Sequence, residues 1–132
     1  MKIDHIGIAV KSIAEAVKVY EQALGLKVAS YDQVDDQGVR LAMLGIGESF
    51  LELLESTRPD SPIEKFVSRR GEGLHHIAVR VDNIDEALER LKATGARLID
   101  STPRRGAHNT RTAFIHPSST RGVLLELVEH GE

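Results

Sequence analysis

The sequence contains no cysteine. The chain therefore has no disulfide, no thiolate nucleophile and no Cys-ligated metal. This is compatible with the cytoplasm, which is the expected location. Positive charge is also not in excess, because 17 Lys and Arg residues stand against 20 Asp and Glu residues, a net charge of −3. A chain without excess cations gains little by displacing phosphate counterions, so nucleic acid is not expected as a partner.

Long apolar runs are absent as well. No stretch approaches the roughly 18 apolar residues that indicate a membrane span, and the N-terminus lacks the apolar region of a signal peptide. We therefore expect no association with a membrane. The 132 residues, 41% of them hydrophobic, predict one globular domain of ordinary composition.

The sequence contains an internal repeat. When residue 3 is aligned with residue 74, IDHIGIAVKSIAEAV lies over LHHIAVRVDNIDEAL, and six of fifteen positions are identical. Each half continues with a helix that ends at Gly25 or Gly95, a short strand, a polar turn and two further strands. We predict an α+β fold of two tandem βαβββ modules that form a curved mixed sheet around a metal-containing cleft, with the helices outside. The first module spans about residues 1–57 and the second about residues 73–132.

Helix starts are marked by side chains that can cap them. Ser12 and Glu15 form a capping box in which the serine accepts from the Glu15 N–H and the glutamate reaches back, and Asn83 and Glu86 repeat it. A third helix is predicted from Pro62 to Arg70, inside a linker of about residues 61–72. Its proline occupies the first helical position.

Two histidines and two glutamates recur in register within the repeat. His5 and His76 fall on the strand face with small residues, whereas the bulky aliphatic residues take the other face. Glu52 in FLELLES and Glu126 in VLLELVE stand among leucines, where an ionised carboxylate is costly unless it is paired. Each residue alone would pass for a core histidine or a surface glutamate. Together they predict a divalent metal site, since imidazole and carboxylate suit Zn, Co, Ni, Fe or Mn.

The other histidines are weaker candidates. His75 adjoins His76, and the repeat alignment selects His76 of the two. His108 is expected in a loop and His116 at a strand end. His130, two residues from the C-terminus, is expected to be solvated.

Three stretches of the chain resemble the methylmalonyl-CoA epimerases of the vicinal oxygen chelate (glyoxalase) superfamily. They are IDHIGIAV at the start, DSPIEKFVSRRGEGLHHIAVRVDNID in the middle and GAHNTRTAFIHPSSTRGVLLELVE at the end. The resemblance covers nearly the whole chain and implies that its metal ligands are His5, Glu52, His76 and Glu126. It also implies cobalt as the divalent ion, with nickel, manganese and zinc as alternatives, a homodimer, and a role in propionate metabolism.

The activity implied is epimerisation of methylmalonyl-CoA, in which C2 loses a proton and regains it on the opposite face through a metal-stabilised enolate. Glu126 is the expected base on one face and Glu52 the leading hypothesis for the other. Some members carry Gln in place of Glu52, and some carry a catalytic glutamate three residues after the glycine of the QGV turn, where this chain has Leu41. Lys65, Arg104 and Arg105 are candidate partners for the CoA phosphates.

Two other functions stay open. Lactoylglutathione lyase (glyoxalase I) resembles this chain in its two-His, two-Glu metal set, and it also moves a proton between adjacent oxygenated carbons. A non-catalytic small-molecule-binding protein of the same superfamily is the alternative of another class. Such binders typically lack the full set of four ligands, so the set found here counts against that alternative.

Overall fold

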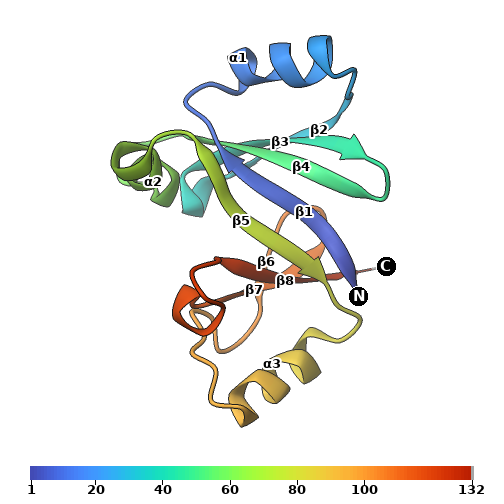
Figure 1. Ribbon diagram of the computed structural model, residues 1–132, viewed down its shortest axis with the longest axis vertical. Helices are drawn as coiled ribbons and strands as arrows, with labels where there is room; N and C mark the ends of the chain where they lie inside the picture. Colours follow the sequence, from blue (N-terminus) through green and yellow to red (C-terminus); the bar gives the residue numbers. More distant parts are fainter. Residues whose placement is uncertain (132) are drawn as a thin grey trace. The chain divides into compact units, whose positions relative to one another are not determined.

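The computed structural model describes residues 1–131, which form two compact units (Figure 1). The N-terminal module comprises residues 5–75, and the C-terminal module comprises residues 76–131 with residues 1–4. The chain thus passes from one unit to the other just before His5 and again just before His76. The predicted α+β class with two tandem βαβββ modules is confirmed.

The N-terminal module has a mixed sheet in the order β2-β3-β4-β1, in which β1 runs parallel to β4 and the other pairs are antiparallel. Its elements are β1 (Lys2–Ala9), α1 (Ile13–Val17), a π-helical segment (Lys18–Ala23), β2 (Val28–Val34), a 3-10 turn (Asp35–Gln37), β3 (Val39–Ile46), β4 (Ser49–Ser56) and α2 (Pro62–Arg70). In Figure 1, α1 lies along one side of β2, β3 and β4.

The C-terminal module repeats this arrangement in the order β5-β8-β7-β6, with β5 parallel to β8. Its elements are β5 (Gly73–Arg80), α3 (Ile84–Ala93), β6 (Arg104–Arg105), β7 (Thr110–Ile115), a 3-10 turn (Pro117–Ser119) and β8 (Leu125–His130).

One predicted strand is reduced in the C-terminal module. After Gly95 only an isolated bridge between Leu98 and Ile115 forms, and β6 has two residues. The side chain of Asp100 accepts a hydrogen bond from the Phe114 N–H at 2.8 Å, which takes up a donor that a longer strand would have used. Pro103 follows and has no N–H to offer the ladder.

The helix caps form largely as predicted. Ser12 Oγ accepts from the Glu15 N–H at 3.2 Å, and Asn83 Oδ1 accepts from the Glu86 N–H at 3.0 Å. The reciprocal arm of the first box differs, because the Glu15 carboxylate pairs with Lys18 at 3.2 Å instead of reaching back. The helix from Pro62 to Arg70 is confirmed.

Each module buries one face of its sheet under its helix. In the N-terminal module the apolar cluster on that face contains Ala42, Leu44 and Leu53 from the strands. In the C-terminal module the corresponding cluster contains Ala113, Ile115 and Leu127. Because side chains alternate along a strand, the residues between these point to the opposite face of each sheet.

A repeated carboxylate ties each helix start to the last strand of its module. Glu55 Oε1 accepts from the Ile13 N–H at 2.7 Å, and Glu129 Oε1 accepts from the Ile84 N–H at 3.0 Å. An arginine on the neighbouring strand pairs with each glutamate at 3.2 Å, Arg40 in one module and Arg111 in the other. The duplication therefore extends beyond the candidate metal ligands to the contacts that orient the helices.

Arg111 also binds the first turn of α3. It donates two hydrogen bonds to the Asp85 carboxylate, at 3.0 and 3.1 Å. The hydrogen bond from Arg111 lowers the pKa of Asp85, and the hydrogen bonds to Asp85 and Glu129 raise the pKa of Arg111.

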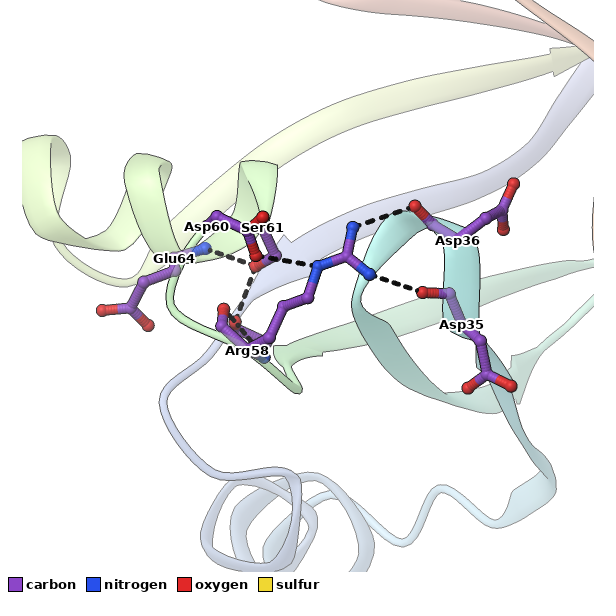
Figure 2. A network of polar contacts seen from close by, with 7 residues as sticks. Asp35, Asp36, Arg58, Asp60, Ser61 and Glu64 are labelled. Carbon is purple, nitrogen blue, oxygen red and sulfur yellow. Dashed lines mark hydrogen bonds and ion pairs between the residues drawn. The ribbon is translucent and has the colours of Figure 1, made fainter.

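Arg58 holds the turn before β3 against the connection from β4 to α2 (Figure 2). Its guanidinium donates to the backbone carbonyls of Asp35 at 2.8 Å and Asp36 at 3.0 Å, and its Nε lies 2.8 Å from Asp60. Gly38 closes the turn at a φ of 65° directly beneath the arginine side chain.

We expect Gly38→Ala to destabilise the protein more than Gly25→Ala. Both glycines have positive φ, so each substitution carries the conformational cost of a left-handed alanine, about 1–2 kcal/mol. A Cβ at residue 38 would also lie 2.8 Å from Arg58 Nε, whereas a Cβ at residue 25 would meet nothing within 4 Å. Urea unfolding of the two variants measures the difference, and equal losses would contradict the contact with Arg58.

Among the described helices, none is long and apolar enough to cross a membrane.

Candidate functional site

In the N-terminal module, His5 and Glu52 face each other on the sheet surface opposite the helix. The parallel pairing of β1 and β4 sets Gly7 opposite Glu52, so no side chain at residue 7 separates Glu52 from the histidine two residues earlier. His5 Nε2 lies 3.5 Å from Glu52 Oε1, and both side chains are nearly buried. These ligand atoms are close enough to share one metal ion.

The C-terminal module repeats the arrangement. β5 and β8 are parallel, and Ala78 stands opposite Glu126, so the small residue again follows the histidine by two positions. His76 Nε2 lies 3.3 Å from Glu126 Oε1, and both side chains are again nearly buried. Phe114, the β7 neighbour of Glu126, packs its ring against the edge of the His76 ring, with the centroids 5.5 Å apart. This contact orients the imidazole.

The spacing within each pair is also one that two ligands of a single divalent metal ion can have. A charge-assisted hydrogen bond between imidazolium and carboxylate is about 2.7–2.9 Å long, and both separations exceed that. Two ligands bound at about 2.0–2.2 Å to one ion stand roughly 3.0–3.5 Å apart. Imidazole nitrogen with carboxylate oxygen is also a donor set that first-row divalent metals accept.

The structure separates the adjacent histidines. His76 belongs to the buried pair, whereas the His75 ring meets the Phe66 ring edge-on with centroids 4.9 Å apart. The Arg70 guanidinium lies 5.7 Å from the Phe66 centroid. His75 therefore contacts α2, whereas His76, which the repeat alignment selects, pairs with Glu126.

The three predicted phosphate partners differ in placement. Lys65 is exposed on α2. Arg104 stands opposite Thr112 on β7, and Arg105 stands opposite Arg111. Successive residues alternate between faces, so Arg104 shares the face of Thr112 and Phe114, which Glu126 also takes, whereas Arg105 points to the helix side. Arg104 Nε also lies 3.3 Å from Asp100.

The remaining histidines carry local contacts. His108 has a φ of 56° in the loop before β7, as expected of a loop residue. His116 Nδ1 accepts from the Ser118 N–H at 3.0 Å and so caps the turn after β7.

The prediction for His130 is wrong. Its Nε2 lies 2.5 Å from Asp4 Oδ1 within the C-terminal module, and its side chain is only 30% exposed. The pair joins residues 126 positions apart, which no local sequence signal could reveal.

The sequence analysis also did not predict that the Glu55 and Glu129 carboxylates bind the helix starts. Their signal was present, because both follow a candidate ligand glutamate by three residues, in FLELLES and VLLELVE.

The chain is similar to known proteins over most of its length. The family model described as the Glyoxalase/Bleomycin resistance protein/Dioxygenase superfamily matches residues 4–114. The mitochondrial methylmalonyl-CoA epimerase of Dictyostelium discoideum is 36% identical over 129 residues, which cover 97% of this chain and 78% of that protein.

Two solved structures are similar over almost their whole length. A variant of the Streptomyces coelicolor methylmalonyl-CoA epimerase in complex with 2-nitronate-propionyl-CoA is 40% identical, with a TM-score of 0.95, and the match covers 99% of this chain and 95% of that one. A methylmalonyl-CoA epimerase in complex with methylmalonyl-CoA and NH4+ is also 40% identical, with a TM-score of 0.94, covering 98% and 94%. The lactoylglutathione lyase of Salmonella typhimurium is more distant, at 26% identity over 130 residues, 98% of this chain and 93% of that protein.

Proposed function

Because the chain belongs to the Glyoxalase/Bleomycin resistance protein/Dioxygenase superfamily, we propose that its two His–Glu pairs serve one metal-dependent reaction, the epimerisation of methylmalonyl-CoA. The observation that carries the proposal is the duplicated pair, nearly buried in both modules at a spacing that suits metal ligands. The substrate is inferred from the epimerases to which the chain is similar over almost its whole length.

His5, Glu52, His76 and Glu126 are the ligands in this proposal. These four residues would hold a divalent ion, which would supply Lewis-acid stabilisation of negative charge on the substrate oxygens as the C2 proton leaves. A glutamate alone, with an ordinary pKa of about 4.3, is a weak base for such a carbon acid. The two carboxylates therefore need that assistance before they can move the proton.

Glu126 and Glu52 are the proposed bases on opposite faces of C2. One carboxylate takes the proton, and the other, in its protonated form, returns a proton to the opposite face. In this chain Leu41 stands where some epimerases have a glutamate, and Glu52 stands where some have glutamine. In this proposal the second carboxylate is therefore that of Glu52, and not that of a glutamate at the position of Leu41.

Exchange of the C2 proton of methylmalonyl-CoA with solvent deuterium tests the proposal. Protein stripped with a chelator is expected to show no exchange, and cobalt is expected to restore both exchange and epimerisation. Metal analysis should show one divalent ion per chain, a readout independent of activity. Metal-replete protein that exchanges no C2 proton would contradict the proposal.

The same preparation tests the alternatives. Isomerisation of the methylglyoxal–glutathione hemithioacetal at a higher kcat/KM than methylmalonyl-CoA epimerisation would favour lactoylglutathione lyase. Protein purified without chelators that holds no stoichiometric metal would favour the non-catalytic binder. The homodimer, the cytoplasmic location and the preference for cobalt stay predictions.

A further inference from the structure

Three cationic side chains, those of Lys65, Arg69 and Arg70, are exposed on α2. Lys65 and Arg69 are four residues apart, so they are neighbours on one side of the helix. Within residues 1–131, no carboxylate forms an ion pair with any of the three. Cations in a last helical turn stabilise the helix dipole, but Lys65 lies outside that turn, so the dipole does not account for the group.

An aromatic contact holds one of the three cations in place. The Arg70 guanidinium lies 5.7 Å from the Phe66 centroid, inside the limit of about 6 Å for a cation–π contact. The Phe66 ring in turn meets the His75 ring edge-on. Arg70 is therefore positioned by a ring and not by a carboxylate, so its N–H groups stay available to a ligand. A planar guanidinium of this kind is a surface on which a nucleobase can stack.

α2 connects two strands that carry proposed metal ligands. β4, which carries Glu52, leads into α2, and α2 leads into β5. On β5, Leu74 is 69% exposed and shares a face of the strand with His76, two residues further along. An exposed apolar side chain thus lies on β5 between the end of α2 and His76.

A CoA thioester carries its groups in a matching order. Its acyl group is followed by a largely uncharged pantetheine chain, and then by an adenosine that bears a pyrophosphate and a 3′-phosphate. Resting on the function proposed above, we propose that α2 binds this nucleotide end, with Arg70 against the adenine and with Lys65 and Arg69 on the phosphates. The helix then selects CoA esters over esters of the same acid with pantetheine alone.

This assignment chooses among the three cations that the sequence predicts as phosphate partners. Arg104 Nε lies 3.3 Å from an Asp100 oxygen, and Arg105 points to the helix side of its sheet. Lys65, in contrast, has cationic neighbours on its own helix. Hydrogen bonds from cations to phosphate oxygens are about twice as strong as neutral ones, so several such donors together favour a phosphorylated ligand.

Methylmalonyl-CoA and methylmalonyl-pantetheine, which lacks the nucleotide, are the paired substrates for the test. The double variant Lys65→Gln with Arg69→Gln should raise KM for the CoA ester about tenfold or more and leave its kcat unchanged, because remote contacts bind substrate and transition state equally. Its kcat/KM for the pantetheine ester should stay within about twofold of wild type. Arg90→Gln with Lys92→Gln, which removes the same charge from exposed positions of α3, is the matched control and should change neither substrate.

Arg70→Lys tests the stacking separately, because lysine keeps the positive charge but has no planar group. The probe is adenosine 3′,5′-bisphosphate, whose binding is measured by calorimetry in the absence of any thioester. Its Kd should rise about fivefold or more in Arg70→Lys, as expected for the loss of one stacked base. An unchanged Kd would remove Arg70 from the assignment.

Nucleotide binding also separates the site from the reaction. If the Lys65 and Arg69 double variant binds the bisphosphate as tightly as the α3 control does, α2 is not the nucleotide site. Equal losses of kcat/KM with the CoA and pantetheine esters would overturn the assignment as well, since the nucleotide would not be what α2 senses. Wild-type protein that binds the bisphosphate through α2 but exchanges no C2 proton would overturn the proposed function and leave the nucleotide site standing.

Discussion

Replacing His76 by alanine should abolish both metal binding and C2 exchange, whereas replacing His75 by alanine should preserve both. His76 Nε2 lies 3.3 Å from Glu126 in a nearly buried pair, so its loss removes a proposed ligand and leaves that carboxylate without its imidazole neighbour. A Lewis acid contributes several kcal/mol to stabilising charge on a substrate oxygen, so exchange should fall by about 10³-fold or more.

His75 is the matched control for this prediction, because it is the same residue type one position away. Its ring contacts Phe66, and an aromatic pair of this kind contributes about 0.5–1.5 kcal/mol to stability. His75→Ala should therefore lower the unfolding free energy slightly and leave bound metal and exchange rate unchanged. Metal analysis, unfolding midpoints and deuterium exchange on both variants separate the outcomes. Equal loss of metal in the two variants would exclude His76 as the ligand that the repeat selects.

The His75 and His76 pair also shows what sequence reasoning could reach. The repeat supplies a register in which each histidine is followed two positions later by a small residue, and the strand pairing then sets that small residue against the glutamate. Alternation along the strand decides which of two adjacent histidines faces the glutamate. The choice of His76 over His75 could be made from the sequence because it depends only on strand periodicity and on the internal repeat.

Contacts between side chains far apart in the sequence could not be predicted from periodicity or from the repeat. The Asp4–His130 pair and the hold of Arg58 on the carbonyls of Asp35 and Asp36 depend on tertiary placement. The short β6 has a similar cause, because the Asp100 side chain takes a hydrogen bond that the pattern assigns to a strand. A periodic signal predicts that a strand is possible, but it does not reveal which competing acceptor will take its donors.

Replacing Glu52 by glutamine should stop epimerisation without stopping all proton exchange. The amide keeps an oxygen that can bind a metal, and some epimerases have glutamine at this place, so metal content should be retained. The amide cannot accept the C2 proton, and the loss of a positioned base lowers the rate by about 10²–10⁴-fold. Exchange should persist only for the enantiomer whose proton Glu126 removes, and that substrate should keep its configuration.

Glu126→Gln is the complementary variant, since it should leave exchange only in the opposite enantiomer. Starting each reaction from a single enantiomer, and following deuterium at C2 alongside stereochemistry, distinguishes the two bases. Both variants losing exchange from the same enantiomer would contradict a two-base arrangement. Full epimerisation by Glu52→Gln would exclude Glu52 as a base and leave it only as a ligand.

The double variant Leu41→Glu with Glu52→Gln should recover the epimerisation that Glu52→Gln alone loses. Leu41 and Glu52 lie on the same face of neighbouring strands, with Leu41 paired to Leu54 two residues beyond Glu52. A carboxylate introduced at residue 41 therefore lies on the sheet face that carries Glu52, the proposed base. It should restore epimerisation at least tenfold over Glu52→Gln alone. Leu41→Glu in the otherwise native chain should not raise the rate, because in this proposal Glu52 already supplies that base. Rescue confined to the double variant would show that this chain carries its second base on β4 in place of β3.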